Sequence, residues 1–435
     1  MIRIYQELSQ ASMDLDHTLN LFDPGARRLV LEAPAFLPAG FESPFQFFMG
    51  EEDPQGQALY YNQVPKPAFW EIEGKHDQAK ILDKGRLRAR IFYQPDQDQA
   101  RLVQTVEWLT ELGQPFQRDH YNAKGRLFAR TSLTSQGHDF LTTYYHVTGA
   151  EVVLHYHETD LYLVQESGKA LLSLVGSQAF YRFALEEMGV WQEDWLINHL
   201  GMPLYLLLER GPSHKDRLVW QESSQQEIPE NLAYILREKT SITRVLVEDS
   251  ETFSYLEQMA PERVRPFGLA YPIYQGPKKQ ELLIVTHSDQ IAALDEIVGG
   301  LSEYRIHIAA LTEMSEKLLV YLSYSNVVLH ETVRTEKLVE LYQSSMIHLD
   351  INFHEEVNQA NRQAFLAGQL NLALKETQHA SPYLKAVYDQ PEELIAVCRL
   401  LLEDPELFLA SRKEQFQLAN GISLEQVEQV WKEGE

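Results

Sequence analysis

Cysteine is nearly absent from this chain. Its 435 residues include a single one, Cys398, so no disulfide can form within the chain and no cysteine cluster can hold a metal. The opening MIRIYQELSQASMDLD lacks the basic and then apolar pattern of an export signal. Apolar runs such as 204–208 and 282–285 are far shorter than the roughly 18 residues of a membrane span. These absences predict a cytoplasmic protein whose contact with a membrane is at most peripheral.

Positive charge is also scarce. Lysine and arginine total 38 against 63 acidic residues, a formal net charge of -25. Because nucleic-acid binding depends on cations that neutralise phosphates, this balance predicts no nucleic-acid partner. Screening limits the overall field to roughly 8 Å, so a small anionic ligand is not excluded. With 44% hydrophobic and 23% charged residues, the composition is that of a globular protein with two or three domains.

The common nucleotide and nucleophile motifs are missing as well. The sequence has no P-loop, no GxGxxG after the first strand and no GxSxG. The loop Thr286–Asp289 could place an anion at the start of a helix, but capping of that helix by Ser288 or Asp289 is the simpler interpretation. We therefore predict no cofactor.

A period of two dominates from about residue 87 to residue 175. Apolar and polar residues alternate through Arg86–Tyr93, and further strand-like runs follow at spacings of about 8–12 residues. Turn signals separate these runs, with little helix between them. The pattern predicts an antiparallel β-meander.

The segments on both sides of the meander alternate between helix and strand patterns. After Gly176 they include Leu204–Leu208, which we interpret as a buried strand. In the last third, short apolar runs such as 282–286, 318–322 and 347–351 are separated by helical stretches. This alternation is typical of parallel sheets covered by helices.

The sequence therefore predicts an α/β fold with two Rossmann-like domains and an antiparallel β-meander domain inserted in the first. The predicted N-terminal Rossmann-like domain is split between residues 1–60 and 176–274, around a meander at 61–175. The C-terminal Rossmann-like domain covers 275–416, and an amphipathic helix follows at 417–435. Ligands of such open sheets bind at the carboxyl ends of the strands.

Aromatic and histidine side chains gather in the meander. Tyr144, Tyr145, His155 and Tyr156 form a candidate surface for a peptide, sugar or partner chain, although ordinary cross-strand packing is the simpler explanation. His155 and His157 share one strand face, so they could hold zinc with a third ligand such as His146. Nothing in the sequence identifies that third ligand, and we predict no metal.

The most informative motif is LDINFHEE at Leu349–Glu356, in a strand–loop–helix context. Here the chain resembles the carboxyl half of a two-Rossmann-domain (GT-B) glycosyltransferase. Retaining enzymes of that type carry two glutamates eight positions apart, which contact the donor sugar and the nucleotide ribose. In this sequence Glu355 is followed eight positions later by Gln363, and Glu356 by Ala364. The second carboxylate is therefore missing in either register.

The basic, glycine-rich diphosphate loop of such enzymes is missing too. After Leu318–Leu322 the chain reads Ser-Tyr-Ser-Asn, whereas a diphosphate needs backbone N–H groups and cations. We interpret Glu355, Glu356 and Gln363 as the remnant of a degenerate donor site, and we predict no catalytic residue.

Over almost its whole length the chain resembles one family, the stabilising subunit of the bacterial O-GlcNAc transferase that modifies serine-rich repeat adhesins. This subunit is often called the glycosylation chaperone of the accessory Sec system. The resemblance rests on four segments of the sequence: MIRIYQELSQASMDLDHTLN, ESPF with the following FF, VEWLTELGQPFQRDHYNAKGRLFARTSL and HLDINFHEEVNQANRQAF.

The resemblance implies a GT-B-like fold and a homologous catalytic glycosyltransferase partner, in a heterotetramer of two copies each. The partner would transfer N-acetylglucosamine from the UDP-sugar to serine and threonine of the adhesin. This chain would stabilise the partner and bind the acceptor, including acceptor that already carries sugars, with the meander contributing to either contact. The complex would work in the cytoplasm, at the inner face of the membrane, before export.

Two other functions stay open at this point. The chain could be an active retaining glycosyltransferase that uses Glu355 or Glu356 with an unrecognised phosphate loop. It could also be a stand-alone carbohydrate- or peptide-binding protein without a catalytic partner. Sugar transfer by the chain alone would favour the first, and failure to co-purify with a transferase would favour the second.

Overall fold

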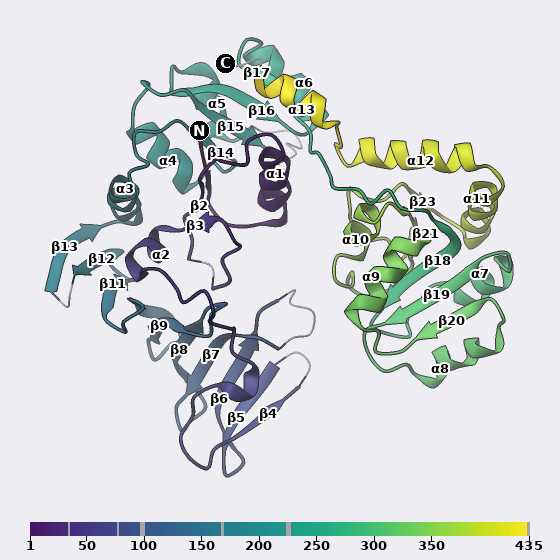
Figure 1. The fold of residues 1–435 in the computed structure, drawn as a ribbon, viewed down its shortest axis with the longest axis horizontal. Coiled ribbons are helices and arrows are strands. Elements are labelled where there is room, and N and C mark those ends of the chain that lie inside the picture. The colour runs from purple at the N-terminus through teal and green to yellow at the C-terminus, as the bar shows by residue number, and fades with distance from the viewer. Residues whose placement is uncertain (34, 76–77, 96–100, 167–168, 223–227, 433–435) are drawn as a thin grey trace. The chain divides into compact units, whose positions relative to one another are not determined.

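The structure is a computed structural model that describes residues 1–33, 35–75, 78–95, 101–166, 169–222 and 228–432. It divides into two compact units, residues 1–267 and 268–433. Three sheets organise these units (Figure 1). Among the described residues, no helix is long and apolar enough to cross a lipid bilayer.

Unit 1 contains a parallel sheet of seven strands, in the order β17-β16-β15-β14-β1-β2-β3. Its strands are β1 (Ile2–Tyr5), β2 (Arg28–Val30), β3 (Phe41–Glu42), β14 (Trp195–Ile197), β15 (Asp216–Trp220), β16 (Ile242–Val247) and β17 (Val264–Pro266). Its helices are α1 (Gln10–Asn20), α2 (Pro44–Met49), α3 (Ser177–Glu187), α4 (Met202–Glu209), α5 (Glu230–Arg237) and α6 (Ser250–Met259). Buried strand residues such as Ile4, Leu29 and Trp195 form the core of this unit.

Between β3 and β14 the chain forms an antiparallel sheet of ten strands, each paired with its neighbour in sequence (Figure 1). The 3-10 helix η1 (Tyr61–Gln63) precedes this sheet. The strands are β4 (Glu71–Gly74), β5 (Gln78–Asp83), β6 (Arg86–Tyr93), β7 (Val103–Leu109), β8 (Pro115–Tyr121), β9 (Leu127–Leu133), β10 (Asp139–Tyr145), β11 (Glu151–Tyr156), β12 (Leu161–Glu166) and β13 (Lys169–Val175).

This meander buries opposite faces at its two ends. Residues that lie opposite each other in neighbouring strands share one face of the sheet. The pairing registers show that Ile91, Val106, Thr143 and Leu154 lie on the same face. At β5–β8 that face forms a small core with residues of the segment before β4, such as Val64. At β9–β12 the opposite face is the one that packs on α2 and α3, through residues such as Val153. The sheet therefore changes its buried side along its width.

Unit 2 contains a parallel sheet in the order β20-β19-β18-β21-β22-β23. Its strands are β18 (Lys279–Thr286), β19 (Arg305–Ala310), β20 (Val327–His330), β21 (Ser345–Asp350), β22 (Leu370–Leu374) and β23 (Ala386–Tyr388). Its helical segments are α7 (Leu294–Gly300), α8 (Glu316–Leu319), η2 (Val320–Ser323), α9 (Thr335–Ser344), α10 (Ala360–Leu366), α11 (Pro391–Glu403), α12 (Pro405–Leu418) and α13 (Leu424–Lys432). Numbered along the unit, this is the doubly wound order 3-2-1-4-5-6.

The predicted fold class is confirmed, because two parallel α/β sheets flank an antiparallel meander inserted in the first of them. Two predicted strands are wrong. Leu204–Leu208 belongs to helix α4, which Pro203 in its first turn helps to start. Leu318–Leu322 forms α8 and η2, where Leu318 is buried in the core but Val320 and Leu322 are each 64% exposed.

Candidate functional site

Each parallel sheet reverses its strand order at one point, and ligands of such sheets bind beyond the carboxyl ends of the strands at that point. In unit 1 the reversal lies between β1 and β14, and in unit 2 it lies between β18 and β21. We call the loops and side chains beyond these strand ends the carboxyl edge of each unit. The two edges differ in their chemistry.

The carboxyl edge of unit 2 is closed by its own loops. The loop after β18 and the loop after β21 pair as an antiparallel bridge between Ile291 and Asn352. Backbone hydrogen bonds join Ala292 N–H to Ile351 O at 2.8 Å and Phe353 N–H to Gln290 O at 3.1 Å. The Asn352 side chain donates to Val285 O at 2.8 Å. The two loops therefore bind each other where a nucleotide would enter.

Asp350, at the end of β21, is the buried centre of this edge. It is 2% exposed and accepts hydrogen bonds from Asn361 Nδ2 at 2.9 Å, His379 N at 3.0 Å and His379 Nδ1 at 2.6 Å. The second ring nitrogen of His379 reaches His354 O. Burial acts to lower the pKa of His379, but the bonds to His354 and Asp350 outweigh it and raise that pKa. This network ties the loop after β21 to the segment after β22.

The predicted donor-site remnant lies on the same loop. Glu356 accepts the Asn361 backbone N–H at 2.7 Å, so its carboxylate stabilises the start of α10, which begins at Ala360. Glu355 and Gln363 are exposed, whereas Ala364 is fully buried. Of the three residues, Glu356 therefore bonds to the start of α10, while Glu355 and Gln363 are exposed to solvent.

The loop after β18 adds negative charge to this edge. Asp289 accepts from Gln290 at 2.9 Å and from Ser315 at 2.9 Å, and these hydrogen bonds lower its pKa. Lys317, the nearby cation, lies 3.5 Å from the same carboxylate. The predicted capping role of Ser288 or Asp289 is wrong, because the bridge at Ile291 delays the helix until Leu294.

The carboxyl edge of unit 1 carries a hydrogen-bonded ladder of polar side chains that the sequence did not predict. Three neighbouring strands are each followed by a polar residue: Asn198 after β14, Gln221 after β15 and Glu248 after β16. Asn198 Nδ2 donates to Ser12 Oγ at 2.9 Å and to Gln221 Oε1 at 3.0 Å, and Gln221 Nε2 donates to Glu248 Oε2 at 3.0 Å. The Asn198 Oδ1 atom is buried without a partner among the described residues.

Glu248 is only partly ionised near neutral pH. Burial raises the pKa of its carboxyl to about 7, with contributions from Asp14 and Asp249, while the hydrogen bond from Gln221 opposes the shift. A protonated carboxyl can donate as well as accept. The edge thus presents amide, hydroxyl and carboxyl groups, which suits a neutral polar ligand. The one signal in the sequence was a polar residue directly after each apolar strand.

The candidate surface on the meander is divided between the two faces of the sheet. Tyr144 and His155 lie on the face covered by α2 and α3, where Tyr144 stacks on Phe45 at 4.4 Å and His155 stacks on Tyr162 at 4.0 Å. Tyr145 and Tyr156 alternate with them and lie on the opposite face. Of the four candidate residues, only Tyr145 and Tyr156 are therefore on the face that does not pack against α2 and α3.

The histidines considered as zinc ligands have other partners. The rings of His155 and His157 are 4.2 Å apart, but His155 Nε2 pairs with Asp160 at 3.0 Å and His157 Nε2 with Thr142 at 2.8 Å. His146 pairs with Thr148 at 2.9 Å. Within the described ranges, no group of three or more His, Cys, Asp or Glu residues is placed to hold a metal ion.

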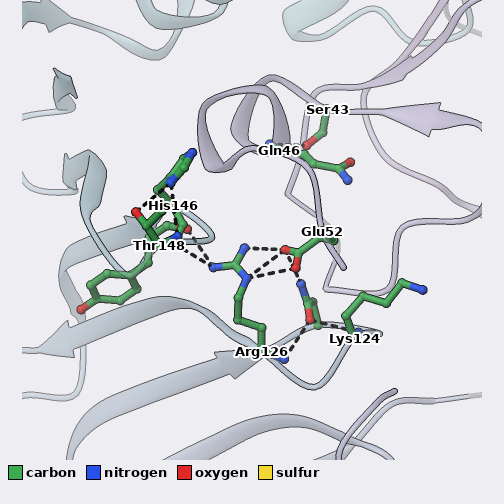
Figure 2. A network of polar contacts seen from close by, with 9 residues as sticks. Ser43, Gln46, Glu52, Lys124, Arg126, His146 and Thr148 are labelled. Atoms are coloured by element: carbon green, nitrogen blue, oxygen red, sulfur yellow. Dashed lines mark hydrogen bonds and ion pairs between the residues drawn. The ribbon is translucent and has the colours of Figure 1, made fainter. Parts of the chain in front are cut away.

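A cavity of about 110 Å³ lies between α2 and the β8–β9 turn, and we call it the α2 pocket. Figure 2 shows the polar network at its side, in which Arg126 lies between Glu52 and the turn that carries His146 and Thr148. The pocket is lined by Ala33, Ala35, Leu37, Ser43, Gln46, Met49, Glu52, Asn122, Ala123, Lys124 and Phe128. No sequence motif had indicated it.

Comparison with known proteins places this architecture in a family. Three family models match: the GtfB middle domain at residues 70–172, the GtfB third domain at 177–259 and the GftB/GlyA-F C-terminal domain at 282–415. The UDP-N-acetylglucosamine–peptide N-acetylglucosaminyltransferase stabilizing protein GtfB of Streptococcus gordonii is 34% identical over 97% of this chain and 96% of its own length. The chain belongs to the GtfB family.

Solved structures agree with this assignment. A crystal structure of a GtfA/B complex bound to UDP and GlcNAc contains a chain that matches with a TM-score of 0.92 at 33% identity, covering 100% of this chain and 99% of that one. The pneumococcal O-GlcNAc transferase GtfA shares the fold, with a TM-score of 0.54 at 11% identity over 99% of this chain and 98% of its own. The predicted family is thus confirmed, and GtfB relatives are named as stabilising proteins.

Two of the sites described above lie within the residues matched by the family models, and part of a third lies outside them. The GtfB middle-domain model spans the tyrosines of the meander, and the C-terminal model spans Glu355, Glu356 and Gln363. The residues that α2 contributes to the α2 pocket lie before the first matched model, in a part of the chain that the full-length GtfB relatives still cover.

Proposed function

We propose that this chain is the non-catalytic subunit of a protein O-GlcNAc transferase complex. It stabilises a homologous glycosyltransferase partner and binds the serine-rich repeat adhesin, while the partner transfers GlcNAc from UDP-GlcNAc to serine and threonine before export. The names of its GtfB relatives and the match to a chain of the GtfA/B complex support this proposal.

The closed carboxyl edge of unit 2 is the observation that carries the non-catalytic role. A nucleotide diphosphate needs backbone donors and cations to offset its charge. At this edge the loops after β18 and β21 use backbone donors on each other, and the cationic groups Lys317 and His379 are already paired with Asp289 and Asp350. Entry of a nucleotide would have to break the bridge and compete with Asp289 and Asp350 for these cationic groups.

The carboxyl edge of unit 1 supports an acceptor-binding role. A serine-rich polypeptide is nearly neutral and offers hydroxyl and amide groups, which the ladder from Ser12 to Glu248 can match. We assign the acceptor or partner contact of the meander to Tyr145 and Tyr156. Tyr144 and His155 support that face of the sheet from behind, since they pack against α2 and α3.

The assembly and its location follow from the same proposal. Two copies of this chain pair with two copies of the transferase, and the heterotetramer works in the cytoplasm, peripherally at the inner face of the cell membrane, as part of the accessory Sec system. Holding the acceptor beside the partner's active site raises its effective concentration, which favours modification of many repeats in succession.

A transfer assay tests the catalytic assignment. The purified chain, the purified partner and their complex are each incubated with UDP-GlcNAc and a serine-rich peptide, and attached sugar is measured by mass spectrometry. We expect no transfer by the chain alone and the fastest transfer by the complex. Transfer by the chain alone would contradict the proposal and favour the active-enzyme alternative.

Calorimetry and co-expression complete the test. We expect the isolated chain to show no stoichiometric uptake of UDP, and we expect it to raise the soluble yield of the partner and to co-purify with it. A chain that neither co-purifies with a transferase nor changes its solubility would instead be a stand-alone binding protein.

A further inference from the structure

The α2 pocket combines apolar walls with a polar end. Met49 and Phe128 are 6% and 5% exposed and provide apolar surface together with three small or aliphatic residues of the loop after β2. Ser43, Gln46 and Lys124 bring a hydroxyl, an amide and an ammonium group to the same cavity. A purely apolar cavity would stay dry, whereas a lining of this kind favours a ligand with one hydrogen-bonding end.

The charged groups at the pocket are already paired. Glu52 accepts from Arg126 Nε at 3.0 and 3.1 Å and from Asn122 Nδ2 at 2.8 Å. Arg126 also donates to Tyr145 O at 2.9 Å, and Lys124 Nζ donates to Pro54 O at 3.0 Å. A cation would have to compete with Arg126 for Glu52 and would meet the ammonium of Lys124, and an anion would have to draw Lys124 away from Pro54 O. The arrangement therefore disfavours ions of either sign and favours a neutral ligand.

The walls of the pocket are fixed by contacts between segments that are distant in sequence. Ala123 N–H donates to Ala35 O at 3.2 Å, which joins the β8–β9 turn to the loop after β2. Gly125 has a φ of +76°, and a Cβ there would lie 2.3 Å from Gln57 O. With the Glu52–Arg126 pair, these contacts form the cavity before any ligand arrives, so binding costs little ordering of the protein.

The volume limits what can enter. About 110 Å³ is somewhat less than the roughly 150 Å³ of an engineered cavity that holds benzene. A group of about five heavy atoms fits, but a whole peptide segment does not. The occupant is therefore a projecting group whose apolar part reaches Met49 and Phe128 and whose polar end meets Ser43 and Gln46.

We infer that the α2 pocket binds an uncharged group that carries a hydroxyl or amide on a short apolar arm. Two parts of an acceptor have this chemistry: the side chain of threonine and the acetamido group of an attached N-acetylhexosamine. The choice between these sources rests on the proposed function, because both belong to the acceptor. The inference that the pocket binds an uncharged group with a hydroxyl or amide does not depend on the proposed function.

Ligand-observed NMR on the full-length chain tests the inference with three probes: free N-acetylglucosamine, N-acetylthreonine methylamide and benzene. We expect one or both polar probes to bind in roughly the millimolar range, as suits so few atoms. Binding of the sugar but not of the threonine derivative assigns the acetamido source. Binding of the threonine derivative but not of N-acetylalanine methylamide, which has the same acetyl cap, assigns the side chain.

Three variants locate the signal. Ala35→Leu fills the cavity, and Gln46→Leu keeps its volume but removes the amide. We expect the affinity to fall about fivefold or more in Gln46→Leu, as for one lost hydrogen bond, and to fall further in Ala35→Leu. The matched control Gln192→Leu makes the same change at an exposed position and should bind as the wild type does.

Three results would overturn the inference: no signal from either polar probe, an unchanged signal in Gln46→Leu, or benzene bound as tightly as the polar probes. If Ala35→Leu does not fold, Gln46→Leu decides alone. Co-purification with the transferase is measured on the same variants. A chain that fails the probe test but still co-purifies refutes the pocket assignment and leaves the proposed subunit role intact.

Discussion

The two parallel sheets reverse their strand order in the same way, but their carboxyl edges differ in structure and chemistry. In unit 1, Asn198, Gln221 and Glu248 present a hydrogen-bonding ladder of two amides and one weakly acidic carboxyl beyond the strand ends. In unit 2 the corresponding loops bind each other through the bridge between Ile291 and Asn352, around the buried carboxylate of Asp350. The comparison teaches that the loops beyond the strand ends, and not the strand order, decide whether such an edge presents polar side chains or closes on itself.

The largest effect is expected from Asp350→Ala. The change leaves donors of Asn361 and His379 without their buried acceptor, so the free energy of unfolding of unit 2 should fall by about 3 kcal/mol. Hydrogen exchange of residues 345–379 and urea denaturation measure this. The control Glu355→Ala removes an exposed carboxylate on the same loop and should cost less than about 0.5 kcal/mol. Equal effects of the two changes would show that the edge is not held by Asp350.

Glu248→Gln tests the neutrality of the other edge through pH. The folded chain raises the pKa of Glu248 from its ordinary value of 4.5 to about 7, so the folded state holds the proton more tightly. The stability contributed by this group is complete below about pH 4.5 and is lost as the pH rises through 7. At pH 8 we expect Glu248→Gln to be more stable than the wild type by about 2 kcal/mol, after allowance for partial hydration.

Urea denaturation followed by the fluorescence of buried Trp195 and Trp220, which lie in this sheet, reports the change. Glu251→Gln, at an exposed position on α6, is the matched control and should show no gain at pH 8. A gain of equal size at pH 4 would mean that removal of charge is not the cause.

Asn198→Ala is expected to have a smaller effect, on acceptor binding. Asn198 joins Ser12 to Gln221 and keeps its Oδ1 without a partner among the described residues, so it can accept one hydrogen bond from a ligand. Affinity of the complex for a serine-rich peptide should fall about fivefold, as for one neutral hydrogen bond. Fluorescence anisotropy measures this, with Asn62→Ala in η1, an exposed position, as control. Unchanged affinity would remove this edge from the acceptor site.

Glu355→Gln should have the smallest effect. Glu355 is exposed, and the donor chemistry is assigned to the partner, so transfer by the assembled complex should stay within a few-fold of the wild type. A catalytic carboxylate would typically cost roughly 10²-fold or more. A loss of that size in a complex that still assembles would contradict the contrast between the two edges.

The sequence was sufficient for features that depend on neighbours along the chain. The meander was predictable because each strand pairs with the next and turn residues separate them. Local pattern failed where an apolar run has no period: Leu204–Leu208 reads equally as strand or helix, and Pro203 decided in favour of α4. The stretch from Ala35 to Phe48, which lacks a clear pattern, contains α2 because Ser43 caps it and Pro44 begins it.

The candidate sites depended on contacts that the sequence does not show. Loss of the second carboxylate was predictable from Gln363 and Ala364, but the capping of α10 by Glu356 was not. The ladder of unit 1 joins α1 to residues after three strands, and the α2 pocket joins three separated segments. Such sites depend on the order of strands that are distant in sequence and on the geometry of the turns. The local sequence pattern reveals neither.

The pairing of β1 with β14 has a consequence for how the chain is made. β1 pairs on one side with β2, which follows it closely, and on the other side with β14, where Ile2 lies beside Trp195. At the usual 5–20 residues per second, roughly 10 to 40 seconds of synthesis separate β1 from β14. The meander between them pairs in sequential hairpins and can assemble during that interval. Before β14 is added, β1 is therefore paired on one side only, with β2, and its other edge stays open while the meander forms.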